Sequence, residues 1–193
     1  MENTDQRLLV WLNSWVGKSQ IFDSAVEWFV SDYLVPVVLA LILLNFWFSG
    51  TTTNDRYRYQ VVVLTALVSM ALASWVVMIN NGIYFRPRPF EEIQLAVLFY
   101  EPTDSSFPAN TSAVTFAIST TIWQVNRRLG IAVLVLSGLF GLSRVYAGVH
   151  YPSDIIAGSF IGIVMSLVVT KFMAVFEIIP KVFIKAVRII CLA

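Results

Sequence analysis

The chain has 193 residues and a net charge of +1 at pH 7, with 58 % hydrophobic and only 13 % charged residues. A soluble domain typically carries about 25 % charged residues, so this composition argues against a water-soluble protein and favours one whose solvent is lipid. The near-zero net charge also gives no support for binding nucleic acid.

Apolar segments long enough to cross a bilayer follow one another along the chain. An amphipathic stretch at 8–16, with two tryptophans, comes first and predicts a helix lying in the membrane interface. A hydrocarbon core of about 30 Å needs roughly 20 mostly apolar residues per helix. Five candidate spans follow, at 25–48, 59–84, 109–123, 129–146 and 152–176.

The third candidate span, 109–123, is short and rich in Ser and Thr, so we expect neighbouring helices to shelter it from lipid. A sixth crossing hidden in 7–24 would change only the N-terminal end. The sequence therefore predicts an all-α integral membrane bundle of five to six transmembrane helices, forming a single domain over 1–193.

Charge is divided unevenly between the two sides of this predicted bundle. Most lysines and arginines fall on the side of the 49–58 and 124–128 connections and the C-terminal end, whereas most acids fall on the opposite side. By the positive-inside rule the first side is cytoplasmic, so the segments 85–108 and 144–154 lie outside. The basic stretch at 181–189 predicts an amphipathic helix on the inner leaflet.

The chain has one histidine, His150, and it lies just before the last predicted span. Pro152 opens that span, since proline is favoured at the first helical position, and Asp154 falls in its first turn. A carboxylate close to one ring nitrogen fixes the tautomer and leaves the other nitrogen free to attack. The pair has the pattern of a nucleophile with its orienting group.

Three arginines lie on the outer side with His150: Arg86, Arg88 and Arg144. Guanidinium matches the geometry of phosphate, so their convergence on one histidine predicts a phosphate site. The run 105–112, which includes Asn110 and several hydroxyls such as that of Ser106, opens the third span, where free backbone N–H groups would add to an anion site. No cluster in the sequence has metal-ligand spacing, so we expect arginine to supply the positive charge and no cofactor to be needed.

These residues resemble the motifs of the type-2 phosphatidic acid phosphatase superfamily, which also includes acid phosphatases and vanadium haloperoxidases. The third motif is matched in full by Ser143, Arg144, Gly148, His150 and Asp154. In the first motif Arg88 and Pro89 fit, but Asn81 stands where the motif has lysine. The second motif ends in histidine, and Thr111 occupies that position here.

The resemblance implies a bundle whose outward-facing site removes a phosphate from a membrane lipid. His150 would form a phosphohistidine intermediate, Asp154 would orient it, and Thr111 would stand where the acid normally is. The phosphate-binding residues would be Arg88, Arg144, Asn81, Arg86, Asn110 and Ala109, with Arg86 restoring the charge missing at Asn81. The site would face the periplasm or cell exterior from the inner (plasma) membrane.

Thr111 leaves three readings open. A polyprenyl diphosphate such as undecaprenyl diphosphate expels a weakly basic lipid monophosphate, and the run at 85–90 resembles bacterial undecaprenyl-diphosphate phosphatases. A monoester phosphatase of the phosphatidate or phosphatidylglycerophosphate type would instead use water, Glu101 or Asp104 as the acid. The third reading is a catalytically impaired lipid-phosphate binding protein or substrate-trapping mutant.

Overall fold

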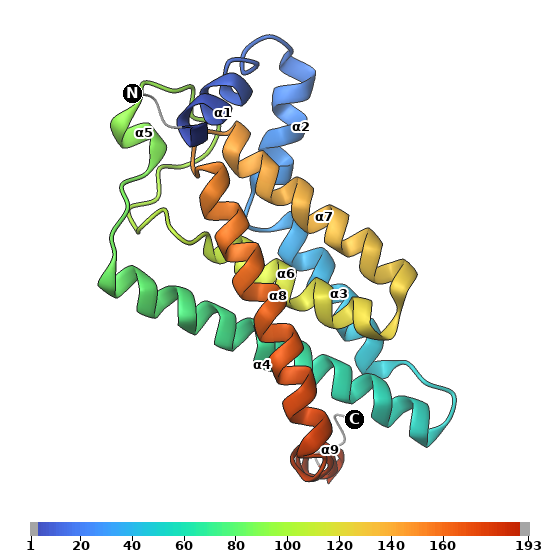
Figure 1. Cartoon of the computed structure of the whole chain (residues 1–193). Coiled ribbons are helices and arrows are strands. Elements are labelled where there is room, and N and C mark those ends of the chain that lie inside the picture. The colour runs from blue at the N-terminus through green and yellow to red at the C-terminus, as the bar shows by residue number, and fades with distance from the viewer. Residues whose placement is uncertain (1–3, 190–193) are drawn as a thin grey trace.

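The computed structural model describes residues 4–189, in which nine helices are joined by turns and loops. The helices are α1 (Thr4–Asn13), α2 (Gln20–Val30), α3 (Leu34–Phe48), α4 (Thr53–Ile83), α5 (Pro89–Glu92), α6 (Asn110–Val125), α7 (Arg127–Tyr146), α8 (Pro152–Val175) and α9 (Ile178–Ile189). The described part contains no strand, which confirms the all-α prediction. Figure 1 shows the long helices α4, α7 and α8 arranged around α6.

Helix α6 is the buried centre of the bundle. It packs against α4, α7 and α8, and its hydroxyl groups bond within the protein: Ser119 to Ser137 at 2.9 Å and Thr121 to Ser166 at 2.8 Å. A glycine, Gly162, lets α8 approach closely, because a Cβ there would lie 2.3 Å from the Ala113 carbonyl oxygen. The predicted shelter of this short, hydroxyl-rich helix is confirmed.

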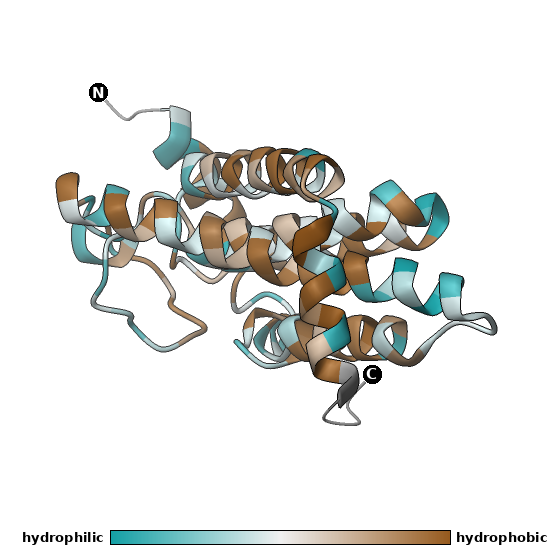
Figure 2. Cartoon of the chain, turned by 90° about the horizontal axis from the view of Figure 1, so that it is seen from below, coloured by the Kyte–Doolittle hydropathy of each residue, from teal (hydrophilic) through white to brown (hydrophobic). Residues whose placement is uncertain are grey.

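Three helices of the described residues, α4, α7 and α8, are long and apolar enough to cross a membrane, and α2 with α3 makes a fourth if that bent pair is one span. At 16 residues α6 is shorter than these. In Figure 2 hydrophobic residues predominate along the long helices, whereas hydrophilic ones gather at helix ends and in connecting segments. The architecture is that of a multi-pass membrane protein, and the count of five to six spans stays a prediction.

The predicted first span, 25–48, is not one continuous helix. It breaks between α2 and α3, which are bent by 49° relative to each other. Pro36 explains the break, because proline lacks an N–H group and its ring would clash with the carbonyl of Asp32 four residues earlier. Helix α3 therefore begins at Leu34, with Pro36 in its first turn, and Asp32 is left in the break.

The two terminal helices flank this bundle. Helix α1 is 10 residues long, about 15 Å, which is too short to cross the hydrocarbon core alone. Its Asn13 side chain donates to the backbone oxygens of Ala96 (2.8 Å) and Tyr146 (2.9 Å), which fastens α1 to the end of α7. At the other end, α9 forms the predicted basic helix and exposes Lys181 and Lys185.

Candidate active site

Segments far apart in the sequence meet at one end of the bundle and enclose a cavity of about 110 Å³. The α2–α3 break, the end of α4, the start of α6 and the turn between α7 and α8 all contribute to its wall. Six of the predicted site residues line it: Asn81, Arg88, Asn110, Thr111, Arg144 and His150. Asp154, Arg86 and Ala109 do not.

His150 is buried in the turn between α7 and α8, and its two ring nitrogens have different partners. Nε2 lies 3.3 Å from Nη1 of Arg88, and Nδ1 lies 3.0 Å from the backbone oxygen of Ser106. A guanidinium can only donate, so Nε2 accepts and the ring proton is on Nδ1, which donates to the Ser106 carbonyl. The lone pair on Nε2 is therefore the one available for attack.

The surroundings of His150 favour its neutral form. Burial lowers the pKa of the imidazole below its usual 6.5, and the positive charges of Arg88 and Arg144 lower it further. The carboxylate of Asp154 acts in the opposite direction but does not outweigh them. A neutral ring at pH 7 keeps its lone pair, as a nucleophile requires.

Asp154 lies close to the His150 ring, and a third residue joins the two groups. Its Oδ2 is 3.7 Å from Nδ1, longer than a hydrogen bond. Ser106 lies between the two groups: its hydroxyl donates to Oδ2 of Asp154 at 2.5 Å, and its carbonyl accepts from the ring. The backbone N–H of Tyr151 also donates to Oδ2, at 2.8 Å. Sequence reasoning had treated Ser106 as one of several hydroxyls near a helix end.

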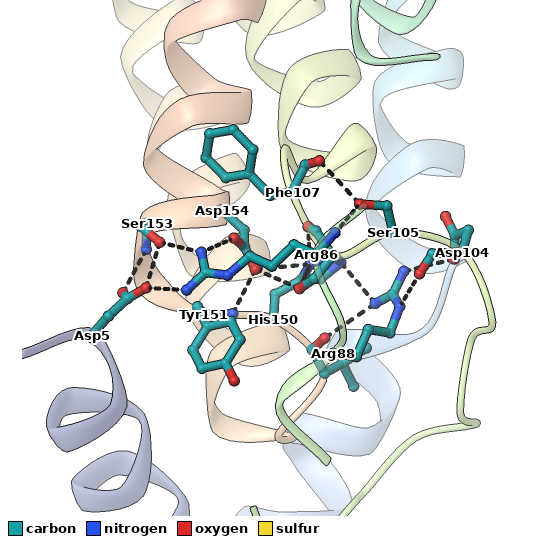
Figure 3. Close-up of polar contacts among 12 residues, drawn as sticks. Asp5, Arg86, Arg88, Asp104, Ser105, Phe107, His150, Tyr151, Ser153 and Asp154 are labelled. Carbon is teal, nitrogen blue, oxygen red and sulfur yellow. Dashed lines mark hydrogen bonds and ion pairs between the residues drawn. The ribbon is translucent and has the colours of Figure 1, made fainter. Parts of the chain in front are cut away.

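Arg86, for which phosphate binding was predicted, does not line the cavity. Its guanidinium donates to Asp154 Oδ1 (2.6 Å), Ser153 Oγ (2.7 Å) and Asp5 Oδ2 (2.8 Å), and it stacks 4.0 Å above the Tyr151 ring. Figure 3 shows Arg86 held between Asp5 and Asp154. The Arg86 guanidinium thus forms ion pairs with two carboxylates. It lies outside the cavity wall and holds the Asp154 side chain in place.

Asp5 is the support that sequence reasoning missed. It comes from α1, and its two oxygens accept from Arg86 and from the backbone N–H and hydroxyl of Ser153 in the first turn of α8. Burial alone raises the pKa of Asp5, but the hydrogen bonds from Ser153 and Arg86 outweigh burial and hold it below its usual value. Asp5 is therefore a carboxylate that ties α1 to the back of the site.

Ala109 does not line the cavity either, and its backbone N–H group has a partner within the protein. That group donates to the backbone oxygen of Asp154 at 3.1 Å, and the side chain is fully buried against Val145 and Ile155. Helix α6 begins one residue later, so the amides of Asn110 and Thr111 belong to its first turn and lack carbonyl partners within the helix. The anion-binding end of α6 starts at Asn110.

Both cavity-lining arginines are buried, and each is paired with a carboxylate at the rim. Arg88 donates from Nη2 to Asp104 Oδ1 (2.7 Å) and from Nη1 to the Val149 carbonyl (3.1 Å). Arg144 lies 4.5 Å from the centre of the Phe99 ring and donates from Nη2 to Asp32. Two desolvated guanidinium groups beside a neutral imidazole make this cavity suited to an anion.

Three buried polar atoms of the cavity-lining residues have no hydrogen-bond partner among residues 4–189: Arg144 Nε, Asn81 Oδ1 and Thr111 Oγ1. Buried polar groups in proteins are nearly always paired, so these atoms indicate a polar ligand. The Arg144 N–H and the Thr111 hydroxyl are donors that phosphoryl oxygens would satisfy.

A model of the PAP2 superfamily matches residues 62–177, which is more than half of the chain and includes the whole cavity except the α2–α3 break. The chain belongs to the PAP2 superfamily. The family predicted from the three motifs is thereby confirmed, and with it the assignment of the chain as a phosphatase.

Curated relatives cover most of this PAP2 chain. The bacitracin transport permease protein BcrC of Bacillus licheniformis is 29 % identical over 155 residues, which is 80 % of this chain and 73 % of that protein. The undecaprenyl-diphosphatase BcrC of Bacillus subtilis is 28 % identical over 154 residues, 80 % of this chain and 76 % of that one. The putative undecaprenyl-diphosphatase YbjG of Escherichia coli is 27 % identical over 168 residues, which is 85 % of this chain and 80 % of that protein.

Two solved structures share the fold. The crystal structure of Aquifex aeolicus LpxE superposes with a TM-score of 0.68 at 23 % identity, covering 88 % of this chain and 96 % of that one. The PAP2-type phosphatidylglycerolphosphate phosphatase of Bacillus subtilis gives a TM-score of 0.59 at 19 % identity, covering 89 % and 84 %. At these identities the likeness shows the fold, and it agrees with the predicted membrane helical bundle.

Proposed function

We propose that this PAP2 protein removes the terminal phosphate of a membrane lipid diphosphate, with undecaprenyl diphosphate as the candidate substrate. The observation that carries the proposal is the lone pair of His150 Nε2 in a cavity that also holds Arg88 and Arg144, with Thr111 in place of a second histidine. The undecaprenyl-diphosphatase relatives support the same choice of substrate. The site would face the periplasm or cell exterior from the inner membrane.

The first step would transfer the terminal phosphoryl group to His150. The Nε2 lone pair attacks the terminal phosphorus, and the bond from phosphorus to the bridging oxygen breaks, so that its electron pair leaves with the lipid monophosphate. Arg88 and Arg144 neutralise the phosphoryl oxygens in the transition state. The positive charge that develops on the ring is stabilised at Nδ1–H by the Ser106 carbonyl and, behind it, Asp154.

The second step would hydrolyse the phosphohistidine. Water attacks phosphorus, the Nε2–P bond breaks, and the electron pair returns to the ring. Inorganic phosphate and neutral His150 result, so the cycle needs no other reactant.

Thr111 supports a diphosphate as the substrate rather than a monoester. A general acid accelerates a reaction by about 10²–10⁴-fold, and it matters most when the leaving oxygen is strongly basic. A lipid monophosphate is a far weaker base than the alkoxide expelled from a monoester. The Thr111 hydroxyl can still donate a hydrogen bond, although it cannot deliver a proton as an imidazolium does.

The test is phosphate release from purified protein given undecaprenyl diphosphate and phosphatidate in parallel, without added metal. We expect turnover of the diphosphate that disappears in His150→Ala. Preferred release from phosphatidate would instead establish the monoester phosphatase. Release of phosphate from neither lipid would favour the third interpretation, a lipid-phosphate binding protein without catalytic activity.

A single substitution tests the leaving-group argument. Thr111→His supplies the missing acid, so we expect monoester turnover to rise by about 10²-fold or more and diphosphate turnover to change far less. The two rates are measured on the same preparations as in the parallel assay. An equal gain on both substrates contradicts the role given to Thr111.

A further inference from the structure

The proposed second step needs a proton acceptor, because the attacking water must lose a proton. His150 cannot serve, since its Nε2 carries the phosphoryl group at that stage, and the chain has no second histidine. The other titratable side chains that line the cavity, apart from the arginines, are Asp32, Tyr100 and Asp104.

Asp32 is the carboxylate held most firmly of these. It lies in the break between α2 and α3, four residues before Pro36. Both of its carboxylate oxygens accept hydrogen bonds. Oδ1 accepts from Arg144 Nη2, and Oδ2 accepts from the Tyr100 hydroxyl at 3.0 Å. Its side chain is 39 % exposed, whereas that of Asp104 is 68 % exposed.

Tyr100 is suited to orient Asp32 rather than to act as the base itself. Burial raises the pKa of the Tyr100 phenol, and the hydrogen bond to Asp32 raises it further. Tyr100 therefore keeps its proton and remains a donor that fixes the direction of the carboxylate.

Arg144 can contact the phosphoryl group and Asp32 at the same time. Its Nη2 is used by Asp32, while its buried Nε has no partner among the described residues. A phosphoryl oxygen at Nε would thus be joined through one planar guanidinium to the Asp32 carboxylate. Through Arg144, the Asp32 carboxylate would therefore be held close to a phosphoryl group bound in the cavity, where it could accept a proton from an attacking water.

We propose that Asp32 is the catalytic base that accepts the proton of the water attacking phosphohistidine-150. This inference rests on the proposed function and deepens it. The water oxygen bonds to phosphorus, its proton moves to Asp32 and the Nε2–P bond breaks. The proton then passes to the departing phosphate or to solvent, which restores the carboxylate.

The deciding experiment separates the two chemical steps in Asp32→Asn, whose amide oxygen can still accept from Arg144 while its NH2 group can donate to the Tyr100 hydroxyl oxygen. With undecaprenyl diphosphate labelled in its terminal phosphate, we expect a burst of undecaprenyl monophosphate equal to one per active site. Steady-state phosphate release should then be slower than in the unchanged protein by about 10²–10⁴-fold. Labelled phosphoenzyme should accumulate on His150.

Glu91→Gln is the matched control, because it removes an exposed carboxylate of α5, between Arg88 and Tyr100 in the chain, without touching the cavity wall. It should show neither a burst nor accumulated phosphoenzyme. Asp32→Ala assayed with added formate is the second variant: a small carboxylate in the vacated space should restore the slow step and leave the burst unchanged.

Two results would overturn the role of Asp32. If both steps slow equally in Asp32→Asn, the residue only positions Arg144; if neither changes, it has no part in the reaction. Failure of the proposed function looks different, since the unchanged protein would then form no phosphoenzyme that depends on His150 and release no phosphate.

Discussion

At the scale of single residues, the site depends on the protonation state of His150. The pKa of this ring is below 6.5 because the ring is buried and lies beside Arg88. A group with a lowered pKa stays neutral above that value and becomes charged only as the pH falls through it. The nucleophile is therefore present at pH 7 and is lost in acid.

The single histidine makes this directly measurable. In untagged protein labelled in histidine, NMR should give one imidazole signal whose titration midpoint lies below 6.5. Asp154→Asn removes the group that favours the charged ring, so the midpoint should move to still lower pH. A midpoint above 6.5, or one that rises in the variant, contradicts this account of the site.

The sequence predicts the site residues that belong to a motif, but not those that reach the site through long-range contacts. His150, Arg88 and Arg144 lie within recognisable motifs, and all three line the cavity. Asp32 had no such signal, because it meets Arg144 across 112 positions of the chain and only the bend before Pro36 brings it there. The pairing of Arg86 with Asp5 had no signal either, because Asp5 comes from α1, which packs back against the site from the N-terminus.

At the scale of elements, the close approach of α6 and α8 holds the site together. Both helices end at the cavity: α6 begins at Asn110, and α8 begins just after His150. Apolar content and length predicted each helix, and the Ser and Thr content of α6 predicted its burial. The bend between α2 and α3 was not predicted, since a proline near the start of a long apolar run fits either one helix or two.

A pair of glycine variants tests the α6–α8 contact. In Gly162→Ala the new Cβ would lie 2.3 Å from the Ala113 carbonyl oxygen, so the helices must move apart, at a cost of about 1–3 kcal/mol. Gly138→Ala in α7 meets nothing within 4 Å, and we expect it to be neutral or slightly stabilising. Thermal unfolding in detergent should show a lower Tm for Gly162→Ala alone. Equal Tm values would mean that the contact is loose.

At the scale of the whole molecule, charge predicts which end faces outward. The cavity is at the end opposite the basic starts of α4 and α7, so the positive-inside rule puts it outside. In a Cys191→Ser background, Thr103→Cys beside the cavity and Thr51→Cys before α4 each give one exposed thiol.

An impermeant maleimide applied to intact cells should label Thr103→Cys at once and Thr51→Cys only after the membrane is permeabilised. The reverse pattern would put the cavity in the cytoplasm, where it would meet a different pool of lipid phosphates. Labelling of both thiols in intact cells would mean that the cells leak.

The contact between Asp5 and Ser153 joins positions 148 residues apart. During synthesis, Asp5 is made early, and its partner Ser153 becomes available only when α8 begins to emerge from the ribosome. Arg86 likewise gains its hold on Asp154 only then. A chain arrested before its last long helix would therefore carry both arginines of the cavity but no supported nucleophile, so that phosphatase activity would begin only when membrane insertion is nearly complete.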